Sequence, residues 1–121
     1  MIPGRYLPRQ LPANLEGLAE LALDMRWSWN HNADDIWQVV DPDLWEATGN
    51  PWLILESISQ KKLATLAEDQ TFLTRLDAAC KDREAYLTES ETWFKRQYGD
   101  TGLNTIAYFS MEFGLSEALP I

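Results

Sequence analysis

The chain has 121 residues, with 10 Lys and Arg against 19 Asp and Glu, which gives a net charge of −9. A chain of this length predicts one domain with a real hydrophobic core. The negative charge argues against nucleic-acid and anionic-membrane binding, because both need clustered cations. No apolar run reaches the roughly 20 residues of a membrane-spanning helix and no secretory signal is visible, so we expect a cytoplasmic protein.

The sequence holds one cysteine and one histidine, Cys80 and His31. A single cysteine forms no internal disulfide, and the pair cannot supply a zinc site of the usual Cys/His type. A thiol nucleophile with a histidine base is the functional alternative. Cys80 follows Leu76 by four residues on the apolar side of a predicted helix, so a small buried side chain is favoured.

The segment from Ala13 to about Trp29 is predicted to form one amphipathic helix, because its apolar residues recur at steps of three and four. The first ten residues, which include Pro3 and Pro8, predict an extended arm before it. The apolar stripe consists of Leu11, Leu15, Leu18, Ala22, Met25 and Trp29, and the solvated face carries Glu16, Glu20 and Asp24.

Three short helices with tight turns are predicted over residues 30–58. Asn32 is expected to cap the first helix, because Asn and Asp accept hydrogen bonds from helix N-termini. Asp41-Pro42 and Asn50-Pro51 mark the starts of the second and third, since each pairs a capping residue with proline at the first helical position. Large side chains near these starts are expected to anchor the helices: Trp37, Trp45 and Trp52.

Three further helices are predicted to begin after Ser59, Asp69 and Ser90. The longest spans about residues 70–88, and the last ends at Gly99. We therefore expect residues 13–98 to form a helical domain of six or seven helices. Its predicted buried residues include Leu15, Leu18, Met25, Trp29, Trp37, Trp45, Leu76 and Phe94.

Residues 105–110 read TIAYFS, a run of β-branched and aromatic side chains that predicts a strand. The backbone groups of a single strand need a partner, and an apolar strand suits a buried sheet. We therefore expect the sequence to be the front part of a longer protein. The alternative is that residues 104–121 form a loop or a helix packed on the helical part.

Two tryptophans close together, Trp27 and Trp29, raise the possibility of a sugar-stacking platform. On an ideal helix they lie about 200° apart, so Trp29 is expected in the core and Trp27 toward a second layer or a partner. Short helices depend on large side chains for burial, so packing is the favoured interpretation of all six tryptophans.

Acidic pairs raise the alternative of a metal site or a glycosidase. They lie at predicted helix starts, where the helix dipole alone explains them. No glycine-rich phosphate loop occurs, and none of the four lysines sits in a setting suited to a cofactor, so we assign no catalytic, cofactor-binding or metal-ligating residue. The pairs are Asp34/Asp35, Asp41/Asp43 and Glu68/Asp69.

Four motifs carry a resemblance to a known family: MRWSWN at 25–30, DPDLWEATG at 41–49, TWF at 92–94 and IAYFSMEFGLSEALPI at 106–121. The last resembles the opening of the catalytic region of bacterial and archaeal α-glucan phosphorylases, the glycogen/maltodextrin phosphorylase family. The other three are similar to the helical N-terminal region of the shorter members. The resemblance covers nearly all of the chain, and the motifs occur in the right order.

The resemblance implies a mainly α N-terminal domain at 1–103, followed at 104–121 by the first strand and exit turn of a Rossmann-like half of a GT-B-type fold. Such enzymes use pyridoxal phosphate and inorganic phosphate to release glucose 1-phosphate from α-1,4-glucan ends, and their cofactor lysine lies in a C-terminal half beyond this sequence. Glu112 and Gly114 would lie near the substrate. Glu112 would orient the next loop, or it is only a turn-capping acid.

The resemblance implies that these 121 residues scaffold the catalytic domain, bind no cofactor themselves and are inactive alone. Expected partners are the remainder of the catalytic chain and, for the parent enzyme, α-glucan and phosphate. Apolar residues left bare are expected to make the isolated chain self-associate. The competing hypothesis is a self-sufficient helical module that binds a partner protein or glucan.

Overall fold

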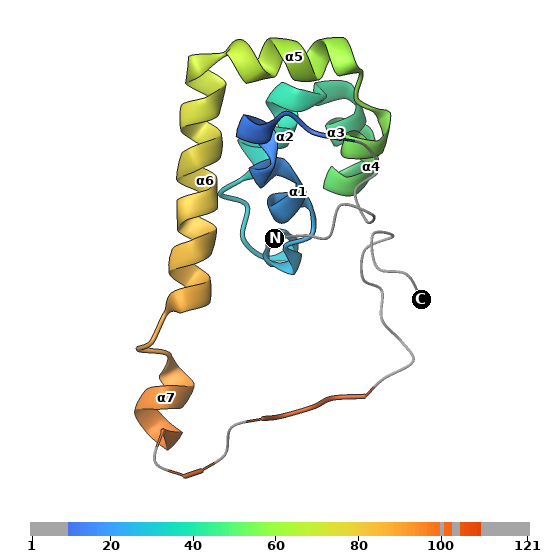
Figure 1. Cartoon of the computed structure of the whole chain (residues 1–121). Coiled ribbons are helices and arrows are strands. Elements are labelled where there is room, and N and C mark those ends of the chain that lie inside the picture. The colour runs from blue at the N-terminus through green and yellow to red at the C-terminus, as the bar shows by residue number, and fades with distance from the viewer. Residues whose placement is uncertain (1–9, 100, 103–104, 110–121) are drawn as a thin grey trace.

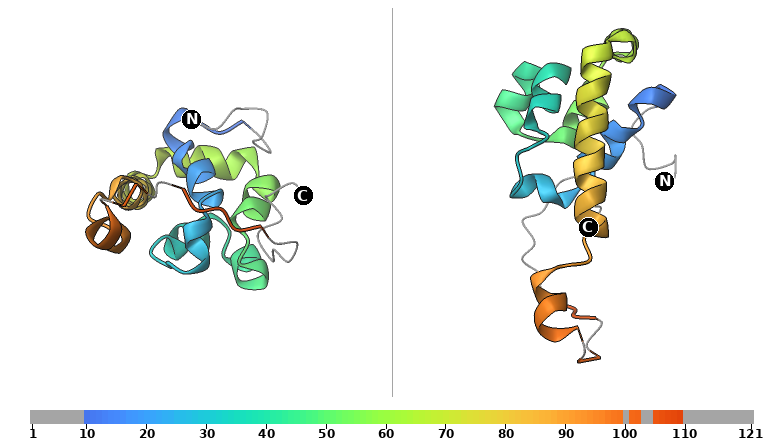
Figure 2. Two further views of the ribbon diagram at one scale, coloured as in Figure 1. Left: turned by 90° about the horizontal axis from the view of Figure 1, so that it is seen from below. Right: turned by 90° about the vertical axis from the view of Figure 1, so that its left-hand side faces the viewer.

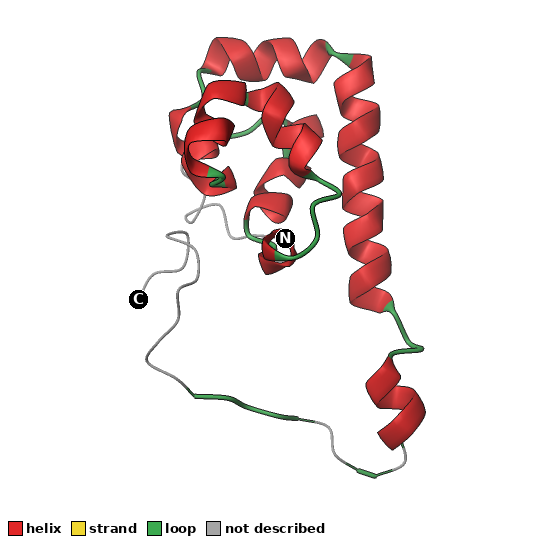
Figure 3. Ribbon diagram, turned by 180° about the vertical axis from the view of Figure 1, so that it is seen from behind, coloured by secondary structure: helices red, strands yellow, loops and turns green. Residues whose placement is uncertain are grey.

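The computed structural model of the chain describes residues 10–99, 101–102 and 105–109 (Figure 1). This part is mainly helical, as predicted, and contains no strand (Figure 3). The elements in chain order are η2 (Ala13–Leu15), α1 (Gly17–Ala22), η3 (Met25–Ser28), α2 (Asp34–Val40), α3 (Pro42–Thr48), α4 (Pro51–Ser57), α5 (Gln60–Glu68), α6 (Gln70–Thr88) and α7 (Trp93–Tyr98).

The short helix α1 lies at the centre of the helical body, between α4 and the long helix α6 (Figure 1). Helices α2, α3 and α4 pack on one another, and α2 also contacts α6. Helix α5 crosses one end of the body and contacts both α6 and η2. Helix α7 lies beyond the C-terminal end of α6, apart from the helices that form the body (Figure 1 and the right view of Figure 2).

The hydrophobic core draws on η2, α1, α2, α4, α5 and the first half of α6, and partly buried residues of α3 pack against it. No residue after Leu76 is buried in the described part of the chain, so the second half of α6 and all of α7 lie outside the core. The largest fully buried side chains are Trp37, Phe72, Leu15, Leu18, Ile36, Ile54, Leu55 and Leu63, together with Pro51.

Gly17 sets the close approach of α1 to α6. A Cβ atom at this position would lie 2.6 Å from Cys80 Sγ and 3.6 Å from Leu76 Cδ1. The first of these separations is far below an ordinary van der Waals contact, so a larger residue at position 17 would require the Cys80 side chain or one of the two helices to shift.

Four predicted helix starts are confirmed by their capping hydrogen bonds. Asp41 Oδ1 accepts from the Leu44 N–H at 3.0 Å, and Asn50 Oδ1 accepts from the Trp52 N–H at 3.1 Å. Proline follows both caps at the first helical position. Ser59 caps α5 and Asp69 caps α6, also through their side-chain oxygens.

Two predicted caps are wrong by one or two positions. The cap of α2 is Ala33, which makes no side-chain capping bond, while the Asn32 N–H donates to Asn30 Oδ1 at 3.0 Å inside the preceding turn. The cap of α7 is Thr92 rather than Ser90, and its Oγ1 accepts from the Lys95 N–H at 3.2 Å. In both cases several adjacent residues are able to cap, and the local turn selects among them.

The single helix predicted from Ala13 to Trp29 is wrong, because the segment divides into η2, α1 and η3. Asp24 has extended dihedral angles, φ −80° and ψ 106°, and its side chain accepts from the Arg26 N–H, which starts a new turn. This break rotates the later residues away from the stripe of α1. Trp29 is consequently 62% exposed, so its predicted burial is also wrong.

The other predicted core residues divide into two groups. Leu15, Leu18, Trp37 and Leu76 are buried, as predicted. The remaining three lie at the margin of the body or beyond it and are only half-buried: Met25, Trp45 and Phe94.

The strand predicted at 105–110 is not formed at residues 105–109, the part of it that the structure describes. A strand needs a neighbouring strand for its backbone N–H and C=O groups, and the described residues offer none. Ile106, Tyr108 and Phe109 are 75%, 81% and 90% exposed. The Rossmann-like continuation and the domain division at 103/104 stay predictions.

Two Trp→Ala variants of the 121-residue chain test the limits of the core. Trp37 is 1% exposed and Trp93 is 63% exposed. Trp37→Ala is expected to lower the free energy of unfolding by about 3–5 kcal/mol, because it leaves a cavity in the core. Trp93→Ala is expected to change it by less than about 0.5 kcal/mol, as for other exposed sites. Urea unfolding followed by circular dichroism measures both, and equal losses would contradict the placement of the core.

The exposed side chains at 106, 108 and 109 predict that the isolated chain self-associates at high concentration. Large apolar groups in contact with water favour contacts between copies. Sedimentation velocity over a concentration series measures this, and Tyr108→Lys with Phe109→Lys is expected to weaken the association. A clean monomer throughout the series would contradict the prediction.

Candidate functional site

Arg26, on η3, is the one buried charged residue in the described part of the chain, at 7% exposure. Its guanidinium group donates from Nη1 to the Asp82 backbone oxygen at 3.1 Å and from Nη2 to Asp82 Oδ2. The Tyr86 ring lies against the same guanidinium, with its centroid 4.9 Å from Cζ. Arg26 therefore ties η3 to the second half of α6.

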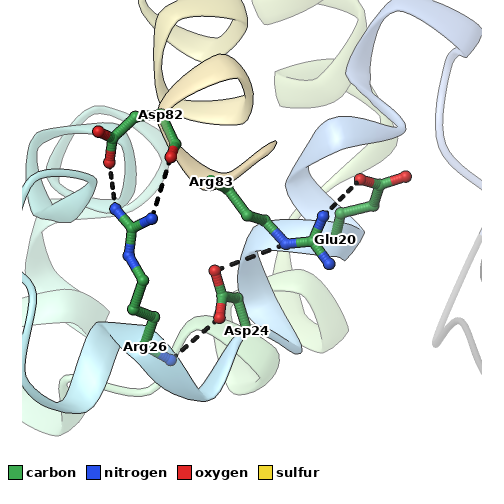
Figure 4. A network of polar contacts seen from close by, with 5 residues as sticks. All are labelled: Glu20, Asp24, Arg26, Asp82 and Arg83. Carbon is green, nitrogen blue, oxygen red and sulfur yellow. Dashed lines mark hydrogen bonds and ion pairs between the residues drawn. The ribbon is translucent and has the colours of Figure 1, made fainter. Parts of the chain in front are cut away.

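A second arginine, Arg83, directly follows Asp82 on α6 and connects this helix to α1 and to the turn after α1 (Figure 4). Its Nη1 donates to Glu20 Oε2 at 3.2 Å, and its Nε lies 3.5 Å from Asp24 Oδ2 in an ion pair. Asp24 also accepts the Arg26 backbone N–H through Oδ1 at 3.0 Å. Asp24 thus links the two arginine contacts into one network.

The five residues of this arginine–carboxylate network come from α1, the turn after it, η3 and α6 (Figure 4). Two guanidinium groups face three carboxylates, and each carboxylate has an arginine or backbone partner. Groups engaged in this way hold elements together, because freeing one of them leaves a partly buried charge without its partner. The arrangement positions helices and offers no nucleophile.

A small pocket lies beside the network. It is lined by Arg26, Asp82 and Arg83 of the network together with Trp27, Asn30, Asn32 and Trp37, among others. Trp27 is half-buried here and lies outside the main core, as predicted. An indole ring beside two amide side chains could also contact a sugar, by stacking and by hydrogen bonds.

Cys80 and His31 make separate contacts. Cys80 is half-buried against α1, and burial, with the nearby Glu20 carboxylate, raises the pKa of its thiol. A raised pKa lowers the thiolate fraction and therefore the nucleophilicity at neutral pH. His31 is exposed and its Nδ1 lies 3.1 Å from Asp34 Oδ2. Cys80 packs against the core, as predicted, but it is only half-buried rather than buried.

The acidic pairs behave largely as helix-start residues. Asp41 and Asp69 are caps, and Asp34, Asp35 and Asp43 lie in first turns. Residues 10–99, 101–102 and 105–109 contain no group of three His, Cys, Asp or Glu side chains placed to hold a metal ion. Across the same ranges no helix combines the length and apolarity needed to cross a membrane.

The two residues predicted to lie near a substrate, Glu112 and Gly114, fall outside the described residues and stay predictions. Sequence reasoning missed the contact between Arg26 and Asp82. One signal pointed toward this region: Arg83 interrupts the apolar stripe of α6, which indicates a charged partner on the element that this face contacts.

The chain matches, over residues 11–119, the family described as "Protein of unknown function (DUF3417)". The chain belongs to this family. The curated relatives it resembles are phosphorylases, and the family is the N-terminal region of such phosphorylases. No solved structure matches the chain significantly.

Three of these relatives illustrate the similarity. The maltodextrin phosphorylase of Thermococcus litoralis is 34% identical over 93% of this chain, and the glycogen phosphorylase of Mycobacterium tuberculosis is 38% identical over 91%. The glycogen phosphorylase of Aquifex aeolicus is 31% identical over 88%. The chain spans only 13–14% of the length of these three proteins.

Removing one side of the Arg26–Asp82 contact tests the structural role of the network. Arg26→Met keeps most of the side-chain stem and removes the charge, and it is expected to lower the free energy of unfolding by about 1–3 kcal/mol. Asp82→Asn should add little in the Arg26→Met background, because the two residues share one interaction. Urea unfolding of the single and double variants measures this coupling.

Lys81→Met is the matched control for Arg26→Met. Lys81 Nζ lies 2.7 Å from Asp77 Oδ2 in an exposed pair on one helix face, and such pairs contribute little to stability. Stability lost equally in Lys81→Met and Arg26→Met would contradict a special role for the buried arginine.

Proposed function

We propose that the chain is the N-terminal region of an α-1,4-glucan phosphorylase and that it scaffolds the catalytic part of that enzyme. The observation that carries the proposal is the similarity to named glycogen and maltodextrin phosphorylases over about nine-tenths of the chain. The parent reaction transfers the terminal glucose of a glucan to inorganic phosphate, which yields glucose 1-phosphate and a shortened glucan.

The described residues do not fit a pyridoxal phosphate site. Such a site needs a lysine held in a protected setting beside donors for the phosphate. Lys61, Lys81 and Lys95 are exposed, Lys62 is half-buried on α5, and none lies beside a phosphate-binding loop. We therefore propose that other parts of the parent enzyme hold the cofactor and its phosphate.

A scaffolding role agrees with the packing of the side chains in the described residues. The core joins η2 to the first half of α6, and the arginine–carboxylate network fixes the second half of α6 to α1 and η3. Both features hold the helices together in one body, and the charged groups of the network pair with one another. A body of this kind is suited to holding a neighbouring domain in place.

A second candidate function is a glucan contact at the pocket beside the network. The observation that favours it is the grouping of Trp27 with Asn30 and Asn32 around one pocket. An exposed face of an indole ring stacks on a sugar ring, and amide groups donate to and accept from sugar hydroxyls.

The phosphorylase proposal is tested by the release of glucose 1-phosphate from maltodextrin with phosphate and pyridoxal phosphate. The full-length protein that contains this sequence is expected to release it. The pure 121-residue chain is expected to release none, because it lacks a cofactor lysine and a phosphate loop. Absence of activity in the full-length protein would contradict the proposal.

Trp27→Ala in the full-length protein separates the scaffold from the glucan contact. A scaffold role predicts a lower melting temperature and an unchanged KM for glucan, because the indole contributes packing alone. A glucan contact predicts a raised KM at an unchanged melting temperature. Trp27→Phe, which keeps an aromatic ring for packing, is expected to recover most of the lost stability.

A further inference from the structure

The second half of α6 and the residues after it carry many large apolar side chains that the core does not use. Among the described residues from 86 onward, none is buried. The exposed fractions are 53% for Tyr86, 59% for Leu87, 63% for Trp93, 46% for Tyr98, 75% for Ile106, 81% for Tyr108 and 90% for Phe109, and Phe94 is half-buried.

Helix α7 has only local support. It is six residues long, and its aromatic rings contact one another: Trp93 and Tyr98 meet edge to face at 5.6 Å, and Phe94 lies 5.6 Å from Tyr98. Isolated helices of this length are unstable in water unless they pack on another element. The described structure places α7 beyond the end of α6, so the helical body gives this helix little stabilising contact (Figure 1).

Two further exposed aromatic residues, Tyr86 and Trp29, lie on the body beside Arg26. The Tyr86 ring packs on Arg26, and the Trp29 N–H donates to the Arg26 backbone oxygen at 3.1 Å. Trp29, at 62% exposure, therefore belongs to the same end of the molecule as Tyr86. We call this set the docking face: Trp29, Tyr86, Leu87, Trp93, Phe94 and Tyr98.

We propose that the docking face packs against the remainder of the phosphorylase chain. This inference rests on the proposed function and names the surface through which the scaffold acts. The occupant follows from length: the relatives are roughly seven to eight times as long as this chain, and the matched family is their N-terminal region.

The composition of the docking face suits a permanent contact. Aromatic side chains each cover about 150–250 Å², so six large residues approach the roughly 800 Å² that one partner contributes to a standard interface. Trp and Tyr are also the residue types that dominate binding energy in interfaces. Helix α7 adds Lys95 and Arg96 and no acidic residue, although the whole chain carries a net charge of −9.

Hydrogen–deuterium exchange of α7 tests the proposal in two settings. In the isolated chain, diluted until sedimentation shows a monomer, the α7 amides are expected to exchange quickly. In the full-length protein they are expected to exchange at least tenfold more slowly, because packing stabilises the helix. Trp93→Ala should abolish this protection in the full-length protein, while Gln97→Ala, an exposed polar position on the same helix, should preserve it.

Two results would overturn the docking proposal. Equal exchange of α7 in both settings would mean that the face stays free. An oligomer of the full-length protein that dissociates in Trp93→Ala would mean that a second copy covers the face instead. Glucose 1-phosphate release by the unsubstituted full-length protein is measured beside these tests, so a failed docking face and a failed phosphorylase assignment give different results.

Discussion

The close contact between α1 and α6 is the constraint on which the rest of the described structure depends. Helix α1 has six residues and no side-chain cap, so its stability comes from burial at the centre of the body. Gly17 permits α6 to approach, and Leu18, Ala19, Leu21 and Ala22 are all buried. Because this contact fixes α6, Glu20 and Asp24 lie within ion-pair distance of Arg83. The apolar packing therefore determines the position of these ion pairs.

Helix α6 changes its role along its length. Its first half supplies Phe72 and Leu76 to the core, and its middle supplies Asp82 and Arg83 to the arginine–carboxylate network. Its last turns supply Tyr86 and Leu87, which are more than half exposed. Apolar burial, partly buried charge pairs and exposed apolar residues thus follow one another along the helix. The core and the charge pairs therefore fix the direction of α6, and its exposed end is where a partner would make contact.

The sequence predicted the local features well because they depend on a few neighbouring residues. The caps at Asp41, Asn50, Ser59 and Asp69 and the long helix at 70–88 follow from short-range chemistry. The break after Ala22 was missed because Asp24 continues the acidic spacing of Glu16 and Glu20, so a cap looked like part of a solvated face. Arg26 and Asp82 are 56 residues apart, and no local pattern reveals such a pair.

The tryptophans show most clearly why burial is harder to predict than helix starts. Trp37 and Trp93 both lie at or near the start of short helices, and sequence spacing treats them alike, yet their exposed fractions are 1% and 63%. The difference arises from what each helix packs against: α2 contacts α3, α4 and α6, whereas α7 has its own rings as neighbours. An exposed tryptophan on a helix too short to be stable alone is unfavourable in water unless another surface covers it. The much longer phosphorylases that the chain resembles have further residues that could supply such a surface.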